Sequence, residues 1–331
     1  MITTYLCRKK GVLEKNIPMD EIESVLDHRD NLLWIDLFKP TLEEINFLKK
    51  TFDFHPLALE DSIHLGQRSK LDEYDGYVFI VLHSIELCSV KELEEAEESE
   101  NVTFTQVACF VGKNYLVTIH HEPACTIKNT MKRCEDDDRV MRNGVGPLFY
   151  NLVDVTVDEY FPILNYFDES IDELEDMIIE NPSKKQLNKI FTLKKELVGL
   201  RKICGPTREV LNTINDRPLP QFTPESRMYF RDVYDHVIRI YDMIDTYRDL
   251  LTNAMEIYLS MVSNRLSEVM KRLAIVATIF MPITFITSFF GMNVKFAYGL
   301  LEKETVFWGI TVAMAGITMA MLWLFRKARF L

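Results

Sequence analysis

The chain has 331 residues, of which 47% are hydrophobic and 27% charged; this composition is typical of a folded protein, and the length suggests about two domains. It carries 38 basic and 50 acidic residues, and the resulting net charge of −12 argues against a nucleic-acid-binding surface. The charge is uneven, because residues 273–331 carry +3 and residues 1–272 therefore carry −15. Six scattered cysteines without a C-x-x-C pair indicate reduced thiols in a cytoplasmic body, and no cleaved signal peptide is expected.

Residues 1–145 predict an α/β domain. Thr41 and Glu44 form a capping-box pattern that predicts a helix over 41–52, and Pro56 opens a second helix that ends at Ser62. Runs rich in Val, Ile, Phe, Tyr and Thr predict strands over 3–8, 32–37, 77–87, 102–111 and 115–120.

Two connections in this domain have distinct patterns. Gly112-Lys113-Asn114 predicts a tight hairpin turn between the last two strands. Residues 91–100 contain six glutamates and are interpreted as a solvated connection, because a Ca²⁺ or Mg²⁺ loop would need converging ligands and a turn glycine.

Strand patterns stop near residue 146, and residues 146–222 predict a helical hairpin. Its two helices are expected over 147–180 and 183–214, separated at Asn181-Pro182. Pro206 is expected to kink or shorten the second helix, because proline lacks the backbone N–H that a helix interior uses.

A single long helix is predicted over residues 223–290. Thr223-Pro224-Glu225 combines an N-cap residue, a proline at the first helical position and an acid in the first turn. No clear stop follows before Gly291, and Pro282 is expected to bend the helix rather than end it. A helix of about 100 Å needs neighbours for stability, so the sequence predicts an oligomer.

Two uncharged runs predict a membrane hairpin. Residues 273–290 and 306–325 are each long enough to cross a hydrocarbon core, and residues 291–305 form the connection. Basic residues flank both spans on the same side: Lys271, Arg272, Arg326, Lys327 and Arg329. The positive-inside rule places this side, with the tail 326–331 and both termini, in the cytoplasm, as expected for a multi-pass protein of a plasma or inner membrane.

One face of the long helix is rich in small, hydroxyl-bearing and Met side chains. They recur at intervals of three or four residues: Ser288, Thr284, Met281, Ala277, Ala274, Met270, Ser267, Ser263, Ser260 and Glu256. The stripe fits either close helix packing or the lining of a mildly polar pathway formed by several copies. At its outer end, Gly291 can end the helix in the left-handed conformation, and the Asn293 amide oxygen would suit a hydrated Mg²⁺ ion.

With the Gly-Met-Asn motif at 291–293 and its two C-terminal spans, the sequence resembles the CorA family of magnesium channels. Residues 55–83, 229–251 and 263–293 also carry the resemblance. It implies a funnel-shaped homopentamer with an αβα cytoplasmic domain, a helical stalk over 223–272 and a selectivity filter at Gly291, Met292 and Asn293. The positions that match the pore lining are Thr284, Met281, Ala277, Leu273, Met270, Ser267 and Glu256. Two positions depart from the common pattern, with Glu256 in place of Asp and Phe290 in place of Tyr.

The resemblance also implies regulatory Mg²⁺ sites between neighbouring subunits. Asp61 and Asp232 match the main site, and Glu60, Asp154 and His236 match a secondary one. Asp232 and His236 are four residues apart and would share one helix face, which is consistent with that role. A solvated acidic face is the alternative interpretation of these residues.

The sequence therefore predicts a Mg²⁺ influx channel, driven by the membrane potential and closed by cytoplasmic Mg²⁺, with Co²⁺ and Ni²⁺ as further cargo. Its expected partners are other copies of the chain, the lipid bilayer and hydrated divalent cations, without nucleotide or nucleic acid. No nucleophile–base pair, metal triad or phosphate-binding loop points to an enzyme. The alternatives are a Zn²⁺ transporter on the same scaffold and a non-conducting two-span signalling protein. Glu302 and Glu304 either concentrate cations at the outer loop or are simply solvated.

Overall fold

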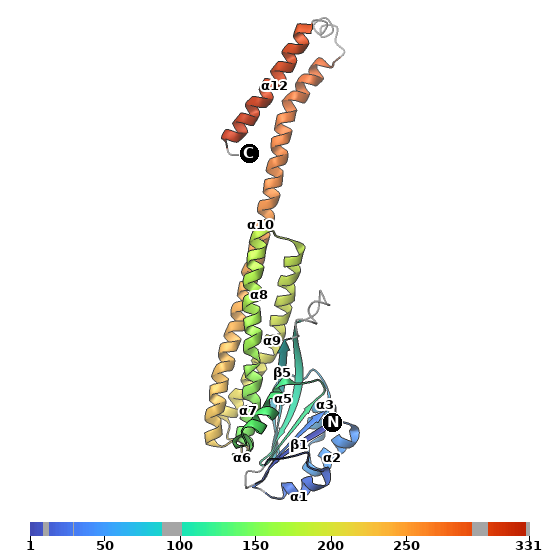
Figure 1. Cartoon of the computed structure of the whole chain (residues 1–331), viewed down its shortest axis with the longest axis vertical. Coiled ribbons are helices and arrows are strands. Elements are labelled where there is room, and N and C mark those ends of the chain that lie inside the picture. Colours follow the sequence, from blue (N-terminus) through green and yellow to red (C-terminus); the bar gives the residue numbers. More distant parts are fainter. Residues whose placement is uncertain (9–12, 29, 88–100, 293–303, 329–331) are drawn as a thin grey trace. The chain divides into compact units, whose positions relative to one another are not determined.

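A computed structural model describes residues 1–8, 13–28, 30–87, 101–292 and 304–328 (Figure 1). The chain forms two compact units, Met1–Met255 and Glu256–Leu331. The first unit combines a β-sheet with helices, and the second is helical in the residues described.

The sheet of the first unit has seven strands in the order β2-β1-β3-β7-β6-β5-β4. The strands are β1 (Ile2–Cys7), β2 (Leu13–Lys15), β3 (Leu32–Phe38), β4 (Lys70–Tyr74), β5 (Tyr77–Leu87), β6 (Val102–Val111) and β7 (Tyr115–His120). The five predicted strands are confirmed. The other two, β2 and β4, lie at the edges of the sheet, where short polar segments can pair although they lack an apolar pattern.

Strand β3 pairs with β7 in parallel, and every other pair among the described strands is antiparallel. The predicted tight turn joins β6 to β7, where the Gly112 amide donates to the Tyr115 carbonyl at 2.9 Å. Strands β5 and β6 form the longest ladder, which runs from Val78 opposite Val111 to Leu87 opposite Val102. The acidic run 91–100 lies outside the described residues.

Short helices cover one face of the sheet: η1 (Met19–Glu21), α1 (Ile22–Leu26), α2 (Leu42–Phe52) and α3 (Pro56–Ile63). The predicted capping box is present, since the Glu44 amide donates to Thr41 Oγ1 at 3.3 Å and the Thr41 amide donates to Glu44 Oε2 at 2.7 Å. The buried Phe54 ring stacks on Phe110 of β6 at 4.1 Å between centroids and anchors this layer to the sheet.

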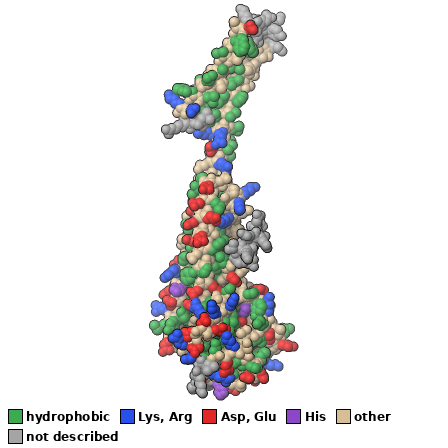
Figure 2. Space-filling view, in the orientation of Figure 1, with side chains coloured by type: hydrophobic (Ala, Val, Ile, Leu, Met, Phe, Trp, Pro, Cys, Tyr) green, Lys and Arg blue, Asp and Glu red, His purple; other side chains and the backbone are tan. Residues whose placement is uncertain are grey.

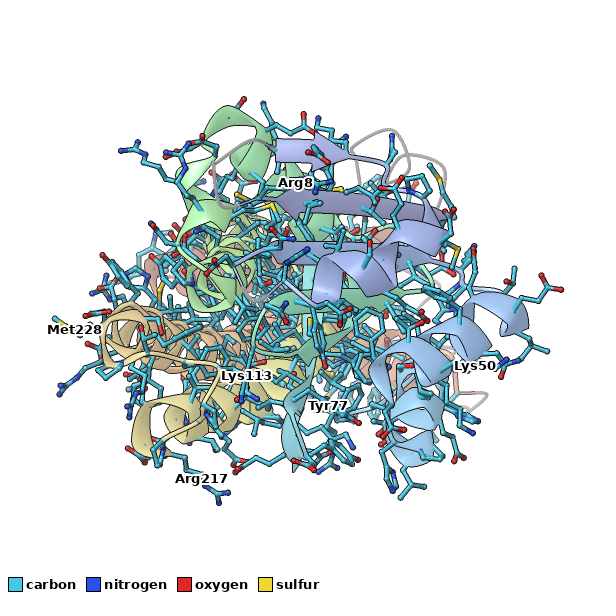
Figure 3. All side chains as sticks on the ribbon, turned by 90° about the horizontal axis from the view of Figure 1, so that it is seen from below. Arg8, Lys50, Tyr77, Lys113, Arg217 and Met228 are labelled. Atoms are coloured by element: carbon cyan, nitrogen blue, oxygen red, sulfur yellow. The ribbon has the colours of Figure 1, made fainter. Side chains whose placement is uncertain are left out.

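Longer helices form the second layer: α5 (Cys125–Asp136), α6 (Arg139–Arg142), α7 (Val145–Asp158), α8 (Tyr160–Glu180) and α9 (Lys184–Asp216). Helices α5, α7 and α8 contact β5, and α9 contacts β4 and β5. In Figure 3, Lys50 on α2 and Met228 on the long helix α10 (Pro224–Phe290) lie on opposite sides of this unit. The predicted αβα sandwich is therefore confirmed.

One prediction about the helices is wrong, and the shortening that was one of two expected effects of Pro206 does not occur. The segment expected as one helix over 147–180 is divided into α7 and α8 at Glu159, whose carboxylate bonds back to strand β5. Helix α9 is not shortened at Pro206 but continues to Asp216. The carbonyl that loses its helical partner there belongs to exposed Lys202, so water can satisfy it, while buried Cys204 and Thr207 hold the helix in place.

The long helix α10 begins directly after the predicted N-cap Thr223 and extends to Phe290, the predicted last residue. The Ser226 amide donates to Thr223 Oγ1 at 3.2 Å, as expected for an N-cap threonine. Its first turns are anchored in the first unit by buried side chains at helical spacing: Phe230, Val233, Val237, Ile240 and Ile244. Arg201 of α9 adds polar anchors, because its Nη1 lies 3.0 Å from Asp245 and its Nε donates to the Tyr241 hydroxyl at 3.1 Å.

Candidate ion pathway and metal sites

The second unit contains the C-terminal part of α10 and helix α12 (Glu304–Lys327). Both helices are long and apolar enough to cross a membrane, and only 6% and 0% of their most apolar windows are buried in the single chain. A core helix of a soluble protein would be mostly buried, so this exposure argues against that reading. Figure 2 shows hydrophobic side chains along these helices.

Basic residues gather at the end of this helical pair where α12 finishes. Arg326 and Lys327 lie in the last turn of α12, and Lys271 and Arg272 precede the apolar part of α10. Acidic Glu304 lies in the first turn of α12, at the opposite end of that helix. The charges thus bracket the apolar segments, as in helices whose ends meet the two membrane surfaces.

The residues of α10 that were predicted to line a pore are all exposed in the single chain. Among them, Leu273 is 61% and Met281 is 72% exposed. The less exposed residues of the same segment lie on a different face of the helix, which includes buried Ile275 and half-buried Ile279 and Ile286. Ala277 and Ile275 are two residues apart, a spacing that corresponds to about 200° around an α-helix, so the exposed stripe and the less exposed face point in nearly opposite directions. Thr284, Ala277, Met270, Ser267 and Glu256 are exposed as well.

The end of α10 differs from the prediction in one respect. Gly291 does not adopt a left-handed conformation, since the described glycines with positive φ are Gly66, Gly76 and Gly144. Instead, the Gly291 amide continues the helical hydrogen bonding to the Thr287 carbonyl at 2.8 Å. A Cβ at this position would lie 3.1 Å from the same oxygen, which favours glycine on grounds of space. Met292 is 56% exposed, and Asn293 lies outside the described residues.

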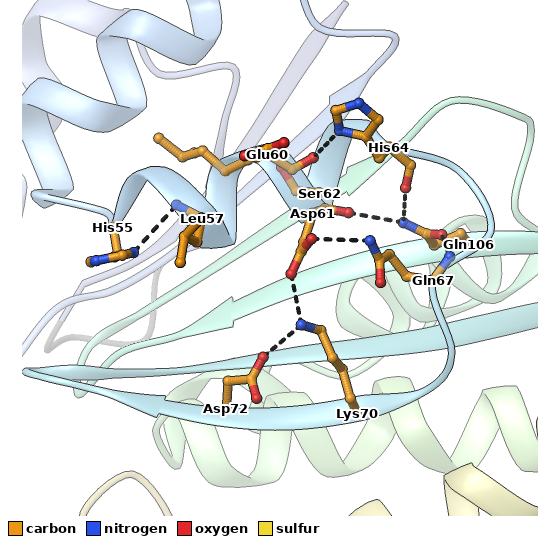
Figure 4. Close-up of polar contacts among 11 residues, drawn as sticks. His55, Leu57, Glu60, Asp61, Ser62, His64, Gln67, Lys70, Asp72 and Gln106 are labelled. Atoms are coloured by element: carbon orange, nitrogen blue, oxygen red, sulfur yellow. Dashed lines mark hydrogen bonds and ion pairs between the residues drawn. The ribbon is translucent and has the colours of Figure 1, made fainter.

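Asp61 lies near the end of α3, and each of its carboxylate oxygens has a partner within its own chain (Figure 4). Its Oδ2 lies 2.7 Å from the ammonium of Lys70, and its Oδ1 accepts a hydrogen bond from Gln67 Nε2 at 3.0 Å. Its side chain is 29% exposed, so it lies at the surface of the unit. Glu60, the preceding residue, is exposed.

Asp154 and Asp232 both act electrostatically on the Tyr150 hydroxyl. Burial raises the pKa of the Tyr150 hydroxyl to about 12, and the negative charges of Asp154 and Asp232 contribute to this shift. Asp154 on α7 accepts from Arg133 Nη1 at 2.7 Å, whereas Asp232 on α10 is exposed.

His236 lies one turn after Asp232 on α10, and its half-buried ring meets the edge of Phe161 at 6.2 Å between centroids. In the part of the chain that the structure describes, no group of three or more His, Cys, Asp or Glu side chains could hold a metal ion. The candidate ligands therefore do not form a complete site within one chain.

Two features of this region were not predicted from the sequence. One is the pairing of the candidate carboxylates with Lys70 and Arg133, and the other is the buried Glu159 at the α7–α8 junction. Lys70 and Asp72 alternate along the edge strand β4, a pattern that puts both on one face, but the strand itself was not predicted. Glu159 Oε2 accepts from the Ser84 hydroxyl at 2.9 Å and from the Ile85 amide at 3.2 Å. Its Oε1 is buried without a hydrogen-bond partner among the described residues.

Glu159 is expected to make the stability of the first unit depend on pH. Burial raises its pKa to about 7, more than the hydrogen bonds from Ser84 and Ile85 lower it. Because the folded pKa exceeds the ordinary value of 4.5, protonation stabilises the fold, and this stabilisation is lost as pH rises through about 7. Between pH 5 and pH 8, Glu159→Gln should remove up to about 3 kcal/mol of the pH-dependent change in unfolding free energy. An unchanged pH profile of thermal unfolding in this variant would contradict the assignment.

The α/β body and the two exposed apolar helices are the architecture of a membrane protein with a large extramembrane domain. A family model described as CorA-like Mg²⁺ transporter protein matches residues 29–327. The chain belongs to this family, whose members are ion transporters rather than enzymes.

Individual relatives agree with this assignment. The chain is 36% identical over 318 residues to a cobalt/magnesium transport protein CorA of Thermotoga maritima, covering 94% of this chain and 87% of that protein. It is 33% identical to YfjQ, a putative metal ion transporter of Bacillus subtilis, covering 100% and 99% of the two chains. The solved structure of the CorA magnesium transporter from Methanocaldococcus jannaschii matches with a TM-score of 0.84 and 27% identity, covering 99% of this chain and 98% of that one.

Proposed function

We propose that this chain forms a homopentameric channel through which Mg²⁺, and also Co²⁺ and Ni²⁺, enter the cytoplasm. The single observation that carries the proposal is the exposed stripe of α10, which faces away from the covered side of the same helix and leads to the Gly-Met-Asn motif. The names of the Thermotoga and Methanocaldococcus relatives support Mg²⁺ as cargo, and the former also supports Co²⁺.

In this proposal, residues 273–290 and 306–325 are the membrane spans, residues 223–272 the stalk and residues 291–305 the outer loop. The basic ends of both helices lie in the cytoplasm, following the positive-inside rule. Copies of α10 surround a central axis and present the stripe to it: Thr284, Met281, Ala277, Leu273, Met270, Ser267 and Glu256. Gly291, Met292 and Asn293 form the entrance.

The chemistry of this pathway suits a hydrated ion. The stripe carries no formal charge between Ser267 and Ser288, so it offers hydroxyls, thioethers and methyl groups rather than carboxylates. Mg²⁺ dehydrates reluctantly and keeps most of its water, and neutral dipoles can hold that water without trapping the ion. A membrane potential supplies about 4.6 kcal/mol per 100 mV for a divalent ion, so uptake needs no nucleotide.

Cytoplasmic Mg²⁺ is proposed to close the channel. Asp61 and Asp232 would bind it between neighbouring subunits, and Glu60, Asp154 and His236 would provide the secondary site. Exposed Asp232 and partly exposed Asp61 are accessible from the surface of the first unit, as a site shared between subunits requires. Residues 1–272 carry −15, so bound divalent ions would offset repulsion between subunits, and their loss would release the closed arrangement.

The proposed lining predicts that a cysteine at Ala277 becomes a site of block. In a variant without native cysteines, Ala277→Cys should let a thiol reagent reduce Mg²⁺ uptake by about tenfold, because the modified side chain would obstruct the pathway. Uptake into proteoliposomes before and after treatment gives the measurement.

Ile275→Cys is the matched control, since Ile275 lies on the covered face of the same helix. Its uptake should withstand the reagent. Equal block at both positions, or none at Ala277→Cys once labelling is complete, would contradict this lining and favour packing as the role of the stripe.

A further inference from the structure

The ammonium group of Lys70 lies between two carboxylates. Its Nζ is 2.7 Å from Asp61 Oδ2 and 2.7 Å from Asp72 Oδ2 (Figure 4). The same ammonium lies 5.5 Å from the centre of the Phe79 ring. The Lys70 side chain is 31% exposed, so this cation is only partly available to solvent.

The backbone fixes this arrangement from several elements. Lys70 and Asp72 are two residues apart on β4, so both side chains leave the same face of that strand. Gln106 of β6 holds the end of α3, and with it Asp61, in place. Its Nε2 donates to the main-chain oxygens of Asp61 and His64 at 3.2 and 3.1 Å. Its Oε1 accepts from the Gln67 amide at 3.0 Å. Asp61 and Lys70 are thus brought together by strands β4 and β6 and the end of α3.

The net charge of Asp61, Lys70 and Asp72 determines how strongly Asp61 attracts a metal ion. The Lys70 ammonium forms ion pairs with both Asp61 and Asp72. The three side chains together carry −1 rather than the −2 of the two carboxylates alone. An incoming divalent ion must therefore share or displace a cation that already holds Asp61 Oδ2.

We propose that Lys70 is a built-in competitor of the regulatory divalent ion at Asp61, which sets the Mg²⁺ concentration at which that site fills. This inference rests on the proposed regulatory role of Asp61. Lys70 acts as a positioning and tuning residue, since its ammonium pairs with a carboxylate oxygen that an incoming ion would need. Metal binding releases that oxygen and leaves Lys70 paired with Asp72.

The test follows Mg²⁺ binding without measuring transport. The full-length chain in lipid nanodiscs is exposed to protease over a series of Mg²⁺ concentrations, and the concentration that gives half-maximal protection is recorded. Lys70→Gln should lower this midpoint by about tenfold, because a neutral amide no longer competes for the carboxylate. Lys70→Arg keeps the charge and should leave the midpoint within about twofold of the wild type.

Two controls separate this effect from other causes. Lys50→Gln removes one positive charge from an exposed position on α2. It should leave the Mg²⁺ midpoint unchanged if the effect of Lys70→Gln is local. In an Asp61→Asn background, Lys70→Gln should have no further effect, because the residue it competes for is neutral. Thermal unfolding in chelator verifies that each variant folds, and Lys70→Met, which is also neutral and unbranched, replaces Lys70→Gln if that variant does not.

The outcomes distinguish the two proposals. A wild-type midpoint that Asp61→Asn leaves unchanged would overturn both the regulatory role of Asp61 and the competition. A midpoint that depends on Asp61 but does not fall in Lys70→Gln would overturn the competition alone and leave Lys70 as a structural link between α3 and β4. A fall that Lys50→Gln reproduces would show a general charge effect and would also overturn it.

Discussion

Asn293→Ala is expected to reduce Mg²⁺ uptake by at least about tenfold, because it removes the amide oxygens that would hold hydrated ions at the entrance. The expectation rests on the sequence motif and on the exposed helix face that leads to it. Uptake by purified protein in liposomes, followed with an enclosed Mg²⁺ indicator, gives the measurement. Asn129→Ala, which removes an exposed amide from α5, is the matched control and should keep wild-type uptake.

The outcome that would contradict this assignment is wild-type uptake by Asn293→Ala at low external Mg²⁺. Size-exclusion chromatography and thermal unfolding must show that both variants keep the oligomeric state and stability of the wild type. A loss in both variants would mark a general effect of the substitutions on assembly rather than a role at the entrance.

The double variant Asp61→Ala/Asp232→Ala is expected to keep conducting at millimolar internal Mg²⁺. The wild type is expected to close under the same condition. Without these carboxylates, the ion cannot bridge neighbouring subunits, so the closed arrangement loses its stabilisation. Uptake is measured in proteoliposomes loaded with low or millimolar Mg²⁺, and the ratio of the two rates should approach one in the double variant.

A second double variant controls for the change in net charge. Asp20→Ala/Asp216→Ala also removes two exposed carboxylates, but from η1 and the end of α9. It should close at millimolar Mg²⁺ as the wild type does. Closure that survives in Asp61→Ala/Asp232→Ala would refute regulation through these residues.

Local signals in the sequence predicted much of the first unit. Thr41 and Thr223 each have a side-chain oxygen that accepts from a backbone amide three residues later, and the structure contains both caps. Central strands such as β5 are also evident from sequence, because burial on both faces selects apolar and β-branched residues. Strand β4 escaped prediction because an edge strand takes its stability from pairing with β5, which its charged sequence does not reveal.

The candidate metal site was less accessible to local reasoning. Resemblance to a family singled out Asp61 and Asp232, and nothing in their spacing alone does so. The ion pair between Asp61 and Lys70 depends on how α3, β4 and β6 meet, and contacts of that kind leave no periodic pattern. Glu159 was missed for a similar reason, since its partners Ser84 and Ile85 lie more than seventy residues earlier in the chain.

The central claim is that the chain by itself conducts Mg²⁺ through the membrane. The most direct test reconstitutes the purified wild type in liposomes with low internal Mg²⁺ and imposes a range of inside-negative potentials. This account predicts Mg²⁺ influx that increases with the potential and is absent from liposomes without protein. Absence of influx at every potential from a folded oligomer would contradict it and favour a non-conducting role, whereas influx of Zn²⁺ but not Mg²⁺ would assign the scaffold to zinc.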